Sequence, residues 1–149
     1  MRSISYEVAI TDMASLGQQP HGLTGLGGFG RHRWPVTLRH GPVVLSPLRH
    51  RDRVAWERVR RENMNWLRPW EATLPPGAQL GPATYAGLVR SVTRQAREGR
   101  MLPWLVFYEE NRSRPQLAGQ LTVSGIVGGS ASWGQIGYWV DQHLAGRGI

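Results

Sequence analysis

Three strand-like segments follow one another in the last third of the chain, and this succession limits its possible folds more than any other feature. All are rich in β-branched and aromatic residues, and turn-type residues separate them. They are residues 104–108, 116–123 and 132–140. Parallel neighbours would need crossovers of about a dozen residues or more, and these connections are shorter. The sequence therefore predicts an antiparallel meander.

Helical patterns precede the meander. A strand-like stretch at 43–48 is followed by two segments of helical periodicity, at 52–63 and 84–99. Residues of the first helix that share one side at i, i+3 and i+7 are Trp56, Val59 and Asn63. The order strand, helix, helix and three strands predicts an α+β fold with a mixed, mostly antiparallel sheet.

The first 33 residues lack such periodicity. Residues 1–33 are rich in glycine and polar side chains, so little apolar area is available to offset the entropy of ordering them. We interpret them as a flexible Gly/Arg-rich tail before a domain at 34–149. The tail contains a formal G-x-G-x-x-G match at Gly25, Gly27 and Gly30. No apolar strand precedes it and Trp34-Pro35 follows where a helix is needed, which argues against a dinucleotide site.

Composition excludes several classes of protein. The chain has no cysteine, so disulfides, CxxC metal sites and acyl transfer through a thiolate are excluded. All 18 basic residues are arginine, and without a lysine there is no Walker-type phosphate loop. The histidines show no metal-ligand spacing, so no metal is expected. No signal-peptide or membrane-spanning pattern is present, and we expect a cytoplasmic protein.

The net charge of +8 leaves the type of partner open. An excess of arginine favours an anionic cofactor, RNA or a ribosomal surface, and it also fits a solvated protein surface. The arginines are spread over the tail and both helices rather than interleaved with aromatic residues on one strand. This distribution does not decide between those readings.

The chain ends by passing from a strand-like stretch at 135–140 into glycines, as at a strand-to-helix turn that binds phosphates. With this ending, the sequence resembles the GNAT superfamily of N-acetyltransferases, and within it the RimJ/RimL-like enzymes that modify ribosomal-protein N-termini. The resemblance covers about residues 34–149. It is carried by WPVTLRHGPVVLSPLRHRD, NWLRPWEATLPPG, LPWLVFY, LAGQLTVSGIV and GQIGYWVDQHLAGRGI.

The resemblance implies a three-layer αβα fold that is incomplete here and ends at the strand-to-helix pyrophosphate loop. It also implies direct transfer of an acetyl group from acetyl-CoA to an amine in a ternary complex, with a protein N-terminal amine, such as that of a ribosomal protein, as the expected acceptor. Relatives end this loop with a residue that would stand at position 150. We therefore expect the 149-residue chain to be a C-terminally truncated fragment with impaired activity.

Residue by residue, the resemblance implies a cofactor site at the end of the chain. The family strand at 135–140 splays from its neighbour and receives the pantetheine arm, and the pyrophosphate loop Q/R-x-x-G-x-G/A follows. Ala145 replaces the usual Gln or Arg of that loop, while Gly148 keeps its glycine. The implied cofactor-binding residues are Trp139, Val140, Asp141, Ala145, Gly146, Arg147, Gly148 and Ile149.

The catalytic assignments follow from the chemistry of amine acetylation. Gln135 stands where relatives often have a glutamate base, and a glutamine can orient a water but cannot take a proton near neutral pH. Glu71 is the nearest candidate for substrate binding or proton relay, with a surface carboxylate as the other reading. Trp66 and Trp70 either clamp a peptide terminus or belong to the core.

Two classes of function therefore remain after the sequence analysis. The first is an N-acetyltransferase acting on a protein or peptide N-terminus, with no membrane and no specific nucleic acid as partner. The second is a non-catalytic Arg-rich module that binds RNA or the ribosome. The sequence leaves open which amine is modified, which groups act as base and leaving-group acid, and the oligomeric state.

Overall fold

The computed structural model describes residues 6–9, 34–71, 82–110, 114–127 and 133–149. The strands are β1 (Tyr6–Ala9), β2 (Leu38–His40), β3 (Val43–Pro47), β4 (Met101–Tyr108), β5 (Gln116–Val127) and β6 (Trp133–Val140). The helices are η1 (His50–Asp52), α1 (Arg53–Glu62), α2 (Met64–Leu67), η2 (Arg68–Trp70) and α3 (Tyr85–Arg97).

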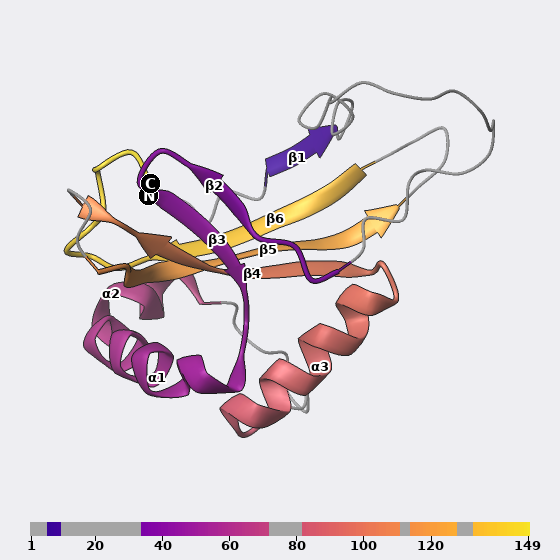
Figure 1. The fold of residues 1–149 in the computed structure, drawn as a ribbon, viewed down its shortest axis with the longest axis horizontal. Helices are drawn as coiled ribbons and strands as arrows, with labels where there is room; N and C mark the ends of the chain where they lie inside the picture. The colour runs from indigo at the N-terminus through magenta and orange to yellow at the C-terminus, as the bar shows by residue number, and fades with distance from the viewer. Residues whose placement is uncertain (1–5, 10–33, 72–81, 111–113, 128–132) are drawn as a thin grey trace.

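The strands form one six-stranded sheet in the order β1-β6-β5-β4-β3-β2, and every neighbouring pair is antiparallel. The predicted meander is confirmed as β4-β5-β6, and the α+β class is confirmed with it. Figure 1 shows α1, α2 and α3 together on one side of this sheet.

The core lies between the helices and the sheet. Leu105 of β4 is fully buried there against Val59 of α1 and Val92 of α3. The next residue, Val106, points to the opposite face, since successive strand residues alternate, and packs in a second cluster with Ala118 and Leu144. Leu144 comes after β6, so the end of the chain covers part of that second face.

Helix α3 forms where the sequence predicts it. The Thr84 side chain accepts a hydrogen bond from the Gly87 N–H at 3.1 Å, which caps the helix, and Gly99 ends it with a φ of 72°. Its buried residues are Tyr85, Val89, Val92 and Ala96. The Tyr85 hydroxyl donates to the Arg49 carbonyl at 3.1 Å, and burial raises the pKa of this phenol.

The edge strand β2 is tied to the end of β4 by a bidentate ion pair. Arg39 donates to both carboxylate oxygens of Glu109, at 2.6 and 2.9 Å. These hydrogen bonds hold the pKa of Glu109 below its usual value. The contact fixes an edge of the sheet far from β6.

Residues 6–9 form strand β1, which the sequence analysis did not predict. They pair with 133–136 of β6, and Glu7 lies opposite Gln135 in the register. The rest of the predicted tail, including the glycine match at Gly25, Gly27 and Gly30, lies outside the described residues. Within the described chain, each helix is too short or too polar to cross a membrane.

Candidate functional site

A cavity of about 560 Å³ lies along β6, between the segment from α1 to η2 and the loop that follows the strand. It is lined by every residue that the sequence analysis placed in the site except Asp141 and Arg147. These residues are Trp66, Trp70, Glu71, Gln135, Trp139, Val140, Ala145, Gly146, Gly148 and Ile149. The fold thus brings the predicted acceptor and cofactor residues to one cavity.

Two glycines in the loop after β6 have positive φ angles. Gly146 and Gly148 have φ angles of 82° and 77°, in the left-handed region that residues with a side chain rarely adopt. Nothing lies within 4 Å of a Cβ built on either glycine, so their faces are open. Backbone N–H groups in such a turn can converge on a phosphate.

Two anchors hold this loop in place. Leu144 is buried, and the Leu144 N–H donates to the Asp141 carbonyl at 2.9 Å. Asn63, at the end of α1, is 1% exposed and connects the helix to the loop. Its side-chain nitrogen donates to the Asp141 carboxylate at 3.1 Å, and its oxygen accepts from the Gln142 N–H at 2.8 Å.

Asp141 and Arg147 therefore have contacts of their own outside the cavity. The Asp141 carboxylate also accepts from the His143 N–H at 3.1 Å, so it organises the loop. The Arg147 guanidinium donates to Glu110 at 3.1 Å, and both side chains are about half exposed. Arg147 would have to leave Glu110 to reach a phosphate in the cavity.

Arg60 is a site residue that the sequence analysis missed. Its guanidinium forms an ion pair with Glu71 and lies over the rings of Trp56 and Trp139, with its carbon 5.9 and 5.4 Å from their centroids. The sequence analysis assigned no role to Arg60. Only the folded chain brings it beside residues 11 and 79 positions away.

Glu71 is exposed at the mouth of the cavity, and the ion pair with Arg60 directs its carboxylate. Trp66 and Trp70 are 37% and 40% exposed, so the reading of these tryptophans as core residues is wrong. Gln135 lines the same cavity from β6. The same cavity is therefore lined by the Glu71 carboxylate, two tryptophan rings and the Gln135 amide.

The outer edge of β6 is open next to the glycine loop. On its inner side β6 pairs with β5 continuously from Gln135 to Val140, so no gap separates these two strands. On its outer side β1 pairs only with 133–136. Among the described residues, 137–140 have no strand partner on that edge, so alternate residues present backbone N–H and C=O groups to the cavity side.

The resemblance implied that β6 splays from a neighbouring strand. Strand β6 does not splay from β5, and the open edge of β6 is the one that faces away from β5. Within the described ranges, no group of three or more histidine, aspartate or glutamate residues could hold a metal ion. The site therefore consists of backbone groups, glycines, aromatic rings and one ion-paired carboxylate.

No family model matches the sequence, and a comparison with curated proteins gives no match. Among solved structures, the chain is similar to RimJ of Mycobacterium smegmatis in complex with CoA-disulfide, with 29% identity and a TM-score of 0.59. The match covers 76% of this chain and 55% of that one.

Two further structures share the fold at lower identity. The ribosomal-protein-S5-alanine acetyltransferase of Vibrio fischeri is 18% identical with a TM-score of 0.56, over 76% of this chain and 60% of that one. RimL, a ribosomal L7/L12 α-N-protein acetyltransferase in its apo form, is 18% identical with a TM-score of 0.53, over 83% and 62%. The chain thus spans between 55% and 62% of the length of these structures.

Proposed function

We propose, from the RimJ/RimL-like GNAT fold of this chain, that the cavity along β6 belongs to an acetyl-CoA-dependent N-acetyltransferase that modifies a protein N-terminal amine. The observation that carries the proposal is the meeting of three parts in one cavity. These are the glycine loop, the open edge at 137–140, and the Trp-rich segment that ends in Glu71.

The donor side, which is the part of the cavity proposed to bind the acetyl donor, is formed by backbone groups. The N–H groups around Gly146 and Gly148 are suited to the pyrophosphate of a CoA molecule, and the edge at 137–140 to the amides of its pantetheine arm. Bound acetyl-CoA would supply an activated thioester carbonyl. The CoA-disulfide held by the M. smegmatis RimJ supports this choice of ligand.

The acceptor side, which is the part of the cavity proposed to bind the amine that receives the acetyl group, is formed by side chains. Trp66 and Trp70 offer apolar surface to the first residues of a peptide, and the Glu71 carboxylate attracts its ammonium group. An amine must lose a proton before it can attack, and Glu71 or a water held by Gln135 takes this proton. Backbone N–H groups near Trp139 and Val140 stabilise the developing oxyanion.

The acceptor is proposed to be the N-terminus of a ribosomal protein, because the V. fischeri and RimL structures are acetyltransferases of ribosomal proteins. Such a reaction would take place in the cytoplasm.

Replacement of Gly148 by Val tests the donor side. A Val at a φ of 77° is strained, and its side chain would stand in the loop where the phosphate is expected. We expect the signal of acetyl-CoA in ligand-observed NMR, which also detects weak complexes, to be lost in Gly148→Val.

The matched control is Gly99→Val, because Gly99 has a similar φ of 72° and lies away from the cavity. This variant should bind acetyl-CoA as the wild type does. Equal acetyl-CoA signals in all three proteins would reject the assignment of the loop. Acetylation of N-terminal peptides, followed by mass spectrometry, tests the reaction itself.

A further inference from the structure

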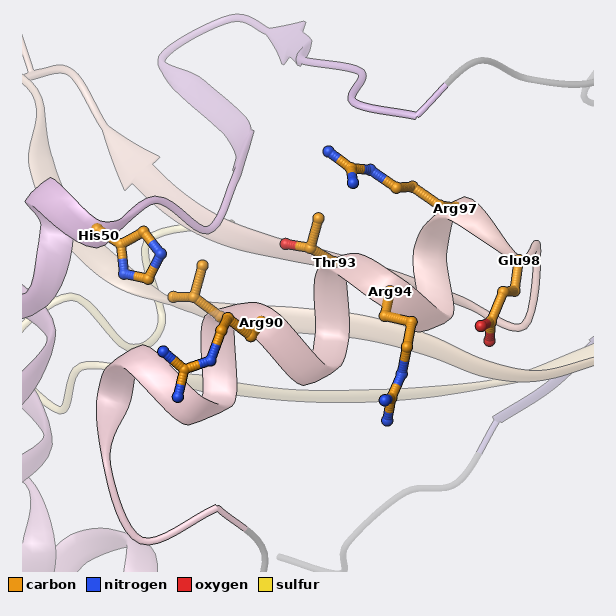
Figure 2. A pocket seen from close by; sticks show the side chains of 7 residues that line it. His50, Arg90, Thr93, Arg94, Arg97 and Glu98 are labelled. Atoms are coloured by element: carbon orange, nitrogen blue, oxygen red, sulfur yellow. The ribbon is translucent and has the colours of Figure 1, made fainter.

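A second hollow lies on α3, apart from the cavity along β6. It has a volume of about 440 Å³ and shares no lining residue with that cavity. Figure 2 shows the guanidinium groups of Arg90, Arg94 and Arg97 fanning out from the outward surface of α3, with His50 beside the start of the helix. We call this surface the α3 arginine groove.

The arginines of the groove share one side of the helix because of their spacing. Arg90, Arg94 and Arg97 stand at i, i+4 and i+7, which lie within about 60° of one another around an α-helix. All three are exposed. Like charges at such spacings repel, while Arg94 and Arg97 in the last turn also interact favourably with the helix dipole.

Their electrostatic environment differs from that of three of the four arginines on α1. On α1, Arg53 pairs with Glu57, Arg58 with Glu62, and Arg60 with Glu71. Helix α3 contains no aspartate or glutamate.

In the part of the chain that the structure describes, the guanidiniums of Arg90, Arg94 and Arg97 have no carboxylate partner. Glu98, the one acidic residue that lines the groove, forms an ion pair with Arg100. The groove therefore presents uncompensated positive charge.

The geometry suits a row of phosphates. From Arg90 to Arg97 the helix rises about 10 Å, a length over which one strand of a nucleic-acid duplex presents about three phosphates. Guanidinium groups bind phosphate oxygens through two hydrogen bonds at once, and Thr93 adds a hydroxyl in the same groove. His50, at one end, is the one aromatic ring among the described residues that line the groove, so the groove lacks a row of rings on which successive unpaired bases could stack.

We propose that the α3 arginine groove binds the phosphate backbone of duplex RNA. The choice of RNA rests on the proposed function, because an enzyme that acetylates ribosomal proteins meets them beside RNA. Phosphate contacts fix position without reading bases, so this binding has no sequence specificity. The groove holds the RNA at α3 while the separate cavity along β6 receives the protein N-terminus.

The experiment compares two variants that each remove three positive charges from a helix. Arg90, Arg94 and Arg97 are changed to Gln in the groove variant, and Arg53, Arg58 and Arg61 are changed to Gln in the control on α1. Binding to a fluorescent RNA duplex of about 20 base pairs is measured by anisotropy between about 50 and 200 mM salt. Neither acetyl-CoA nor peptide is present.

The wild type and the α1 control should bind with similar slopes of log affinity against log salt concentration. The groove variant should lose about two to three units of slope, since each phosphate contact contributes about 0.9. Equal losses in both variants would reject the groove, as would no binding by the wild type. Tighter binding of a DNA duplex, or of a polyglutamate chain, would reject RNA as the ligand.

Circular dichroism shows whether each variant is folded. If the groove variant unfolds, Arg94→Gln is compared with Arg61→Gln, and only Arg94→Gln should lower the slope, by about one unit. Peptide acetylation by the wild type is measured separately. Acetylation without RNA binding rejects this inference alone, whereas α3-dependent RNA binding without acetylation rejects only the proposed function.

Discussion

Asn63 shows how one polar side chain can determine the position of a loop, here the one that follows β6. It is buried at the end of α1, and its amide satisfies the Asp141 carboxylate and the Gln142 N–H together. A third hydrogen bond runs from its side-chain nitrogen to the Val59 carbonyl at 2.9 Å. Because buried polar groups are costly when unpaired, this residue couples the helix to the loop.

Replacing Asn63 with Leu tests this coupling. The variant keeps the branched shape of the side chain but leaves the Gln142 N–H and the Asp141 carboxylate without their partner, so we expect a loss of about 1–3 kcal/mol in the free energy of unfolding. Urea denaturation measures it. Asn65→Leu, at an exposed position of α2, is the control and should change stability by less than about 0.5 kcal/mol. Equal stabilities of both variants would contradict the coupling.

Glu71 is the residue on which the acceptor side of the proposal depends. Glu71→Gln keeps the shape of the side chain but removes the charge that, in the proposed reaction, attracts the substrate ammonium. We expect kcat/KM for peptide acetylation to fall by about 100-fold, with acetyl-CoA binding unchanged.

Glu62→Gln is the matched control for that variant, since Glu62 is also paired with an arginine but lies outside the cavity. Steady-state kinetics of peptide acetylation give kcat/KM for both variants. If Glu71→Gln is as active as Glu62→Gln, Glu71 has no part in the reaction.

At the scale of the elements, the close approach of β5 and β6 shapes the cavity. A Cβ on Gly119 would stand 2.1 Å from the Trp139 carbonyl oxygen, a distance that real side chains do not reach. Near this point the register between β4 and β5 shifts, and the Asp141 N–H donates to the Ala118 carbonyl at 2.7 Å. The absence of a side chain at Gly119 thus permits the close contact between the backbones of β5 and β6, just before the loop that follows β6.

Gly119→Ala should disturb this contact. We expect it to lower the free energy of unfolding by about 1–3 kcal/mol, because the added methyl group must displace the β6 backbone. Gly137→Ala on β6 is the control, since nothing lies within 4 Å of its Cβ position and it should leave stability unchanged. Thermal unfolding compares the two, and a Gly119→Ala protein as stable as Gly137→Ala would show that β5 and β6 are not in close contact there.

At the scale of the whole molecule, β1 connects the beginning of the chain to β6, the strand that lines the cavity. It covers 133–136 and leaves 137–140 to the cavity, so the length of this short strand defines where the open edge begins. An open edge offers unpaired backbone groups to a ligand, whereas a paired edge does not.

Deletion of residues 1–9 should therefore affect one half of β6 selectively. We expect amide hydrogen exchange to become faster in 133–136, whose β1 partner is removed, and to stay unchanged in β4 at the centre of the sheet. Mass spectrometry of peptic fragments measures both. Unaltered exchange in 133–136 would mean that β1 does not protect this edge in solution.

The sequence by itself determined helices α1 and α3, strands β3 to β6 and their order along the chain. Periodicity and the stop at Gly99 predicted α3, and short connections predicted the meander, because these signals act between residues close in the chain. The grouping of Gln135 with the glycine loop also follows from proximity in sequence. The family resemblance supplied the expectation that the Trp-rich segment reaches the same cavity.

Tertiary structure alone decided the contacts between distant residues. Arg60 meets Trp139, Asn63 meets Asp141, and β1 meets β6 only after the chain has folded, and no local pattern encodes such pairs. Arginines that look scattered along the sequence differ in the folded chain, because three of the four on α1 pair with carboxylates and those on α3 do not. The physical reason is that charge compensation depends on distance in space, which the spacing of residues along the chain does not specify.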